Sequence, residues 1–411
     1  MTPFLQLALA LSILITAAKL GGYISLKLGQ PSVLGELMAG LIIGPSVLNV
    51  LHWPFFTDTH LDATIAEIAE LGVLLLMFIA GLDLHLSDLV KSGKVSALAG
   101  TLGVILPVGM GYGLGQFFGL EAIPALFIGL ILAATSVSIS AQTLIELNVL
   151  RSRVGIGLLG AAVFDDILVV LGLSVVVAIA SDAGSDLVGI GLIILRMGLY
   201  LTGSIIFGLW LIPILSRRTD NWPISQGLIA FAFTMCLLYA WAAEVIGGMA
   251  AITGAFVAGL MFARSSVKSR IEAGVSILAY GVFVPIFFIN VGLSANIREL
   301  TGENLWLVAA MIGVAVISKI MGAGLGARLA GFTNLESLQL GVGMMSRGEV
   351  GLIVAALGIS ENIIDPGVFS AVVGVVIVTT LLTPPALRSL FKRENTATVS
   401  PSKESQSSGG R

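Results

Sequence analysis

Long apolar stretches follow one another along this chain and leave room only for short connections. About 20 apolar residues cross the ~30 Å hydrocarbon core of a bilayer as an α-helix. Only 11% of the residues are charged, against roughly 25% in a soluble domain. The predicted fold class is therefore an all-α polytopic membrane protein. We expect about thirteen spans, at residues 4–26, 33–51, 64–82, 94–118, 122–148, 153–181, 187–215, 224–246, 248–264, 274–294, 304–330, 335–359 and 366–390.

The charges on the connections predict the orientation of these spans. Connections that face the cytoplasm collect Lys and Arg. Basic residues fall on every second connection here, with Arg298 as the exception, whereas acidic residues occupy the others. This pattern predicts an N-terminus outside and a C-terminus in the cytoplasm. The basic residues are Lys27, Lys91, Lys94, Arg151, Arg153, Arg217, Arg218, Arg264, Lys268, Arg270, Arg328, Arg388, Lys392 and Arg393.

The remaining composition excludes several classes of function. No connection is long enough for a soluble domain, and the Ser-rich segment 391–411 is predicted to be a disordered cytoplasmic tail. No basic tract is longer than Arg217-Arg218, so we expect no nucleic-acid partner. The single Cys236 cannot form an intramolecular disulfide. The histidines, at span ends or in connections, do not predict a metal centre: His52, His60 and His85.

Two short segments recur after seven spans. GELMAGLI at 35–42 is repeated as GAFVAGLM at 254–261, and MFIAGLD at 77–83 as FINVGLS at 288–294. Because seven is odd, the two halves would have opposite orientations in the membrane. Inverted repeats of this kind are typical of secondary transporters. One uncertainty affects the count, since only Ile246-Gly247-Gly248 separates the eighth and ninth spans and a single bent span is the alternative.

Polar interruptions also occur in a pair seven spans apart. Thr135-Ser136-Val137-Ser138 lies in the middle of the fifth span, and Ser346-Arg347-Gly348-Glu349 lies in the middle of the twelfth. Interrupted backbone at membrane depth is tolerated only beside protein or water, and half-helix ends there carry partial charges suited to an ion. The sequence therefore predicts two broken helices that cross near the midplane.

Two adjacent aspartates, Asp165 and Asp166, lie ~18 Å into the sixth span by the helical rise, which is close to the same midplane. A charged side chain at the bilayer centre costs at least ~2.5 kcal/mol, so two in succession indicate an ion or proton site. Neighbouring residues point ~100° apart on a helix. One carboxylate can therefore bind a cation while the other pairs with a basic group.

Lys319 is the deepest basic group of the eleventh span, ~22 Å from its start. Its counter-charge must come from another helix. Either it forms a permanent bridge with one aspartate or it releases its proton during a transport cycle, and the sequence leaves both open. Arg347 and Glu349 are interpreted as groups that stabilise the ends of the broken twelfth span. Arg196 is interpreted as structural.

At these residues the chain resembles the monovalent cation/proton antiporter superfamily, in particular the bacterial electrogenic sodium/proton antiporters. The segments that carry the resemblance are GQPSVLGELMAGLIIGPSVL at 29–48, AATSVSISAQTLIELNVL at 133–150, GAAVFDDILVV at 160–170, SKIMGAGLGARL at 318–329 and GVGMMSRGEVGLIVAALG at 341–358. Many relatives have Pro where this chain has Ser346, so a sharp break in the twelfth span is less strongly predicted.

The resemblance implies a fold with a mobile core, here about 94–181 and 304–390, and dimerisation helices at about 4–82 and 187–294. It implies that Asp166 is the principal Na⁺ ligand, helped by Asp165, Thr135 and Ser136 around the first break. Lys319 would be the charge partner of Asp165. No resident cofactor is expected, since Na⁺ and H⁺, or Li⁺ or K⁺, would be the transported ions. Partners would be membrane lipid and a second copy of the chain.

The predicted function is a sodium (or lithium)/proton antiporter that works by alternating access, and not an enzyme. The location that the resemblance implies is the bacterial plasma membrane. A potassium/proton antiporter is the near alternative, because the same carboxylates bind either cation. A cation channel is more distant. An intramembrane aspartyl protease is disfavoured, since that chemistry needs two carboxylates that face one water from separate helices.

Overall fold

The computed structural model describes residues 1–28, 30–84, 87, 91–180, 187–220, 223–294, 305–348, 350–351, 354–355, 358 and 363–398, and no strand lies among them. The regular elements in chain order are α1 (Pro3–Lys27), α2 (Ser32–Ile43), η1 (Val50–His52), α3 (Leu61–Asp83), α5 (Gly93–Phe117), α6 (Ala122–Ala133), α7 (Val137–Glu146), α8 (Arg153–Ala180), α9 (Leu187–Asp220), α10 (Gly227–Ala242), η2 (Ala243–Gly247), α11 (Ala251–Phe262), α12 (Lys268–Leu278), η3 (Ala279–Phe283), α13 (Val284–Leu293), α14 (Leu305–Leu329), α15 (Asn334–Gly343) and α17 (Pro366–Thr398). The elements η2 and η3 are π-helical turns that continue α10 and α12.

The predicted spans each have a helical counterpart in the described part of the chain. Ten helical stretches there are long and apolar enough to cross a bilayer, and α2 and α11 are shorter apolar helices. The twelfth predicted span begins as α15. The multi-pass all-α prediction is confirmed. One boundary differs, because α17 continues to Thr398, beyond the residue where the tail was predicted to begin, and 399–411 lie outside the described residues.

The eighth and ninth spans are separate helices. The chain leaves η2 at Gly248, whose φ of +64° is readily adopted only by glycine, and this residue reverses its direction. Helix α11 then packs back along α10. The approach is close enough that a Cβ on Gly254 would come within 2.2 Å of the Tyr239 carbonyl oxygen. The alternative of a single bent span is therefore wrong.

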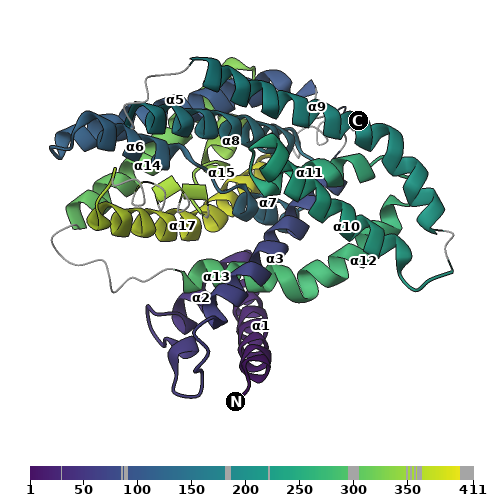
Figure 1. The fold of residues 1–411 in the computed structure, drawn as a ribbon. Coiled ribbons are helices and arrows are strands. Elements are labelled where there is room, and N and C mark those ends of the chain that lie inside the picture. The colour runs from purple at the N-terminus through teal and green to yellow at the C-terminus, as the bar shows by residue number, and fades with distance from the viewer. Residues whose placement is uncertain are drawn as a thin grey trace, which may run out of the picture.

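The contacts between helices define two groups, and Figure 1 shows α1, α2 and α13 together near the N-terminus. Helices α5, α6, α8, α14, α15 and α17 pack together, with α5 and α14 most extensively in contact. Helices α1, α2, α3, α10, α11 and α13 form the other group, in which α3 packs on α11 and α2 on α13. The division of the chain into a core and dimerisation segments stays a prediction. Which group moves stays a prediction.

The packing of α2 on α13 repeats that of α11 on α3, as an inverted repeat requires. The sequence repeat aligns Gly40 with Gly259 and Gly81 with Gly292. A Cβ on any of these four glycines would collide with the facing backbone, so the helices approach as closely as glycine permits. The nearest atoms are matched in the two halves: the carbonyl oxygens of Ile289 for Gly40 (2.2 Å), Phe78 for Gly259 (2.0 Å), Leu37 for Gly292 (2.5 Å) and Phe256 for Gly81 (2.2 Å).

Candidate ion-binding site

Two interrupted helices cross at the centre of the first group. Helix α6 ends at Ala133 and α7 begins at Val137, while the chain after α15 is non-helical from Met344 to Gly348. The two breaks are joined directly, because the backbone N–H of Ser136 donates to the carbonyl oxygen of Ser346 at 2.9 Å. The crossed broken helices are confirmed, and Ser346 in place of Pro does not prevent the interruption. Glu349 lies outside the described residues.

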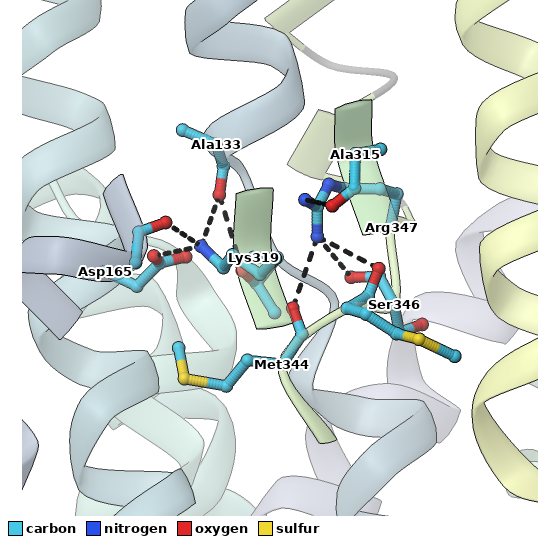
Figure 2. A network of polar contacts seen from close by, with 10 residues as sticks. Ala133, Asp165, Ala315, Lys319, Met344, Ser346 and Arg347 are labelled. Carbon is cyan, nitrogen blue, oxygen red and sulfur yellow. Dashed lines mark hydrogen bonds and ion pairs between the residues drawn. The ribbon is translucent and has the colours of Figure 1, made fainter. Parts of the chain in front are cut away.

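Lys319 of α14 neutralises the first break. Its ammonium lies 2.5 Å from Asp165 Oδ1 and donates to the carbonyl oxygens of Gly103 and Ala133, each at 2.7 Å. Figure 2 shows it pointing between Asp165 and the end of α6. Both side chains are fully buried. The three N–H groups of the ammonium thus have three acceptors, one of which is at the negative end of the α6 dipole. The structure shows the bridge that was one of the two predicted roles for Lys319.

Asp165 keeps one carboxylate oxygen available. Its Oδ2 accepts no hydrogen bond from the described residues, although it is buried. Thr135 is close enough to interact with this carboxyl group. The Thr135 hydroxyl itself donates to Ala133 at a long 3.4 Å, and Ser136 lies 3.1 Å from Ser138, oxygen to oxygen. Of the predicted residues of the first break, Thr135 therefore lies beside Asp165, whereas Ser136 contacts Ser138 and the backbone of Ser346.

Asp166 faces a different partner, as expected for the next residue on a helix. The hydroxyl of Thr253 on α11 donates to Asp166 Oδ2 at 3.4 Å. Both residues line a cavity of about 10 Å³, together with Val137 at the start of α7. That volume is close to the minimum for one water molecule. Sequence reasoning missed Thr253, because a lone Thr in an apolar span gives no signal of a partner on another helix.

At the second break, Arg347 donates to backbone carbonyl oxygens, and no described carboxylate forms an ion pair with it. It is 1% exposed, and its guanidinium donates to the carbonyl oxygens of Met344 (3.2 Å), Met345 (3.0 Å) and Ala315 (3.0 Å). Figure 2 shows it on the opposite side of the crossing from Asp165. Arg347 therefore joins the end of α15 to α14, and its role in stabilising the broken helix stays a prediction.

Two threonines of α17 hold the backbone of Arg347. The Arg347 N–H donates to Thr379 Oγ1 at 3.1 Å, and Thr380 Oγ1 donates to the Arg347 carbonyl oxygen at 2.6 Å. Sequence reasoning missed this pair as well. The sequence does contain a signal for this pair. Thr379-Thr380 follow Gly374 at the same spacing at which Asp165-Asp166 follow Gly160. The threonine pair is thus the second-half counterpart of the aspartate pair.

The other polar candidates lie away from the crossing. His52 and Asp62 form an exposed pair at 3.6 Å, and no group of three His, Cys, Asp or Glu side chains gathers in the described part of the chain. Arg196 donates to the carbonyl oxygens of Val245 and Ile246 at the end of η2, which fits the structural role predicted for it. Glu36, near the first turn of α2, is buried against α1 near Gly22.

The transmembrane profile of the sodium/hydrogen exchangers matches residues 12–393. The chain belongs to the sodium/hydrogen exchanger family. It is 39% identical over 395 residues to the Na(+)/H(+)-K(+) antiporter GerN of Bacillus cereus, covering 96% of this chain and 97% of GerN. It is 34% identical over 383 residues to a Na(+)/H(+) antiporter of Enterococcus hirae, covering 93% and 97% of the two chains.

A solved exchanger structure has a similar fold. The sodium proton antiporter MjNhaP1 from Methanocaldococcus jannaschii, determined at pH 8, superposes with a TM-score of 0.65 at 18% identity, and the match covers 96% of this chain and 97% of that one. The predicted membership of the monovalent cation/proton antiporter superfamily is confirmed. An exchanger family is a family of transporters, which agrees with the prediction that the chain is not an enzyme.

Proposed function

We propose that this exchanger is a secondary active sodium (or lithium)/proton antiporter in which the two ions compete for Asp166. The observation that carries the proposal is the unequal environment of the two aspartates. Asp165 is paired with the buried Lys319, whereas Asp166 faces a small cavity at the boundary between the two groups of helices. The carboxylate beside the cavity is the one that an ion can reach.

Competition for one carboxylate produces obligatory exchange. A bare Asp166 is charged and pays a large desolvation cost if it moves through the apolar barrier. A bound Na⁺ or proton neutralises it, so the loaded site crosses more easily. Thr135 and Ser136 would add oxygen ligands from the first break, with Asp165 nearby. No resident cofactor takes part in this scheme.

Alternating access requires one group of helices to move past the other. We assign the mobile core to α5–α8 and α14–α17, and the dimerisation scaffold to α1–α3 and α9–α13. Support comes from the tight packing inside each group. The scaffold helices α1 and α9 also expose many apolar side chains, including Phe4, Leu199 and Trp210, to lipid or to a second copy. The N-terminus would face outside and the C-terminus the cytoplasm of a bacterial plasma membrane.

Potassium is the second candidate cation. The relative GerN is a Na(+)/H(+)-K(+) antiporter by name, which includes both sodium and potassium. Oxygen ligands bind either ion, and the choice between them depends on how closely the cavity fits. Selectivity is therefore part of the test.

The test uses purified protein in liposomes with an imposed inside-acid pH gradient, whose collapse is recorded on addition of Na⁺, Li⁺ or K⁺. Na⁺ or Li⁺ should collapse the gradient for the wild type and for Asp62→Asn, an exposed-aspartate control. Asp166→Asn should show no collapse. Exchange that survives in Asp166→Asn would refute this site, and collapse with K⁺ alone would assign the protein to potassium exchange.

A further inference from the structure

We propose that Thr253 and the start of α11 form an electrostatic lock that holds the unloaded core against the scaffold. The inference rests on the proposed antiport. Thr253 is the third residue of α11 and is 3% exposed, and it reaches Asp166 on α8 from the other group of helices. We assign it as a positioning residue, since it acts through Asp166.

The direction of this hydrogen bond distinguishes Thr253 from other threonines of the chain. Thr143, Thr219 and Thr234 each donate to a carbonyl oxygen four residues earlier in their own helix. Such bonds are the usual way in which an apolar helix accommodates a hydroxyl. The Thr253 hydroxyl instead donates across helices to a carboxylate. A role in packing alone does not require that partner.

The first residues of two helices border the cavity beside Asp166. Ala250 is extended, α11 begins at Ala251, and Ile252 lines the cavity beside Asp166. Helix α7 begins at Val137, which lines the cavity as well. The N-terminal end of a helix carries partial positive charge and favours an anion. The surroundings of Asp166 therefore stabilise its bare, ionised form.

These two helix ends belong to different groups. Helix α7 lies in the proposed core with Asp166 and would move with it, whereas α11 lies in the scaffold and would stay behind. When an unloaded core leaves this state, Asp166 is still charged. It then loses the N-terminal end of α11 and the Thr253 hydroxyl as neighbours. A core loaded with Na⁺ or a proton loses much less stabilisation, because the charge of Asp166 is neutralised. The contact thus opposes empty crossings, which are the leak that uncouples exchange.

The inverted repeat offers a comparison within the chain. Gly254 aligns with Gly35, so the position of Thr253 on α11 corresponds to Leu34 on α2. Asp166 corresponds to Thr380, which is uncharged. The half that carries no carboxylate has an apolar residue at this position. A hydroxyl is therefore present where a charge has to be held and not where packing alone is needed.

The experiment measures how many sodium ions leave liposomes per proton taken up. Vesicles hold radioactive Na⁺ at equal pH inside and outside, with permeant thiocyanate on both sides to collapse the membrane potential. Uncoupled efflux is sodium efflux without proton uptake. In Thr253→Val, the ratio of uncoupled efflux to coupled exchange should rise by about tenfold, the factor for loss of a hydrogen bond to a charged group. Thr253→Ser should restore the wild-type ratio. Thr219→Val, which removes a buried hydroxyl bonded within its own helix, should leave the ratio unchanged.

A wild-type ratio in Thr253→Val with exchange intact would overturn the lock. If Thr253→Val does not fold, the same ratio measured in Thr253→Ala decides in the same way. Equal leak in Thr253→Val and Thr219→Val would also overturn it, since the hydroxyl would then have only a packing role. Failure of the wild type itself to exchange Na⁺ for protons would refute the proposed function instead.

Discussion

The two breaks use the same backbone device with different chemistry. In each, a buried basic side chain donates hydrogen bonds to carbonyl oxygens at the end of a half-helix. Lys319 does so at the end of α6, and Arg347 does so at the end of α15. Lys319 is also paired with Asp165. No carboxylate lies within ion-pair distance of Arg347 among the residues that the structure describes. Among the described residues, the first break thus has an acid–base pair, and the second has an arginine that donates to backbone carbonyl oxygens.

The helices beside the breaks differ in the same sense. Helix α8 supplies Asp165 and Asp166, whereas α17 supplies Thr379 and Thr380 at the corresponding positions. Threonine hydroxyls can bond the backbone but cannot exchange a proton for a cation near neutral pH. We infer that inverted symmetry provides the two access states and that, among the described residues, the first half provides the titratable site. The predictions below test this division of roles.

The largest effect is expected for Arg347→Met. It removes the donors to Met344, Met345 and Ala315 and leaves buried carbonyl oxygens unpaired, each at a cost of ~1 to 3 kcal/mol. The detergent-solubilised variant should lose monodisperse protein on heating far below the wild-type temperature, or fail to fold. Arg347→Lys should be intermediate, because one ammonium cannot reach all three oxygens. Wild-type thermal stability in Arg347→Met would contradict the role of Arg347 at this break.

A smaller loss, and one that can be rescued, is expected at the first break. Lys319→Met leaves Asp165 buried without its partner, which costs ~3 to 5 kcal/mol for a buried pair. Adding Asp165→Asn removes the orphaned charge and should recover much of the melting temperature. Arg347→Met has no equivalent rescue through a nearby carboxylate in the described structure. Additive losses in the Lys319→Met and Asp165→Asn double variant would show that the bridge is not an important contribution.

Much of the arrangement of the two breaks was predictable from residue patterns. The layer of polar residues followed from span length and the helical rise, so the crossing of the breaks was foreseen from Thr135 and Arg347. Side-chain contacts between different helices were not predictable, because the order of the spans does not determine which helix faces meet. The partner of Lys319 was therefore not known before its distance to Asp165, and the contact of Thr253 with Asp166 had no sequence signal.

The smallest expected effect is at Thr380, and it contrasts most sharply with its counterpart Asp166. Thr380→Val removes the hydroxyl that donates to the Arg347 carbonyl oxygen at 2.6 Å, which should cost about 1 kcal/mol of stability. A slightly lower melting temperature with retained sodium/proton exchange in liposomes is expected, whereas Asp166→Asn should abolish exchange. Loss of exchange in a well-folded Thr380→Val would mean that the second half contributes ligands to the transport site. Retained exchange would instead place ion binding in the first half, with the second break as its fixed support.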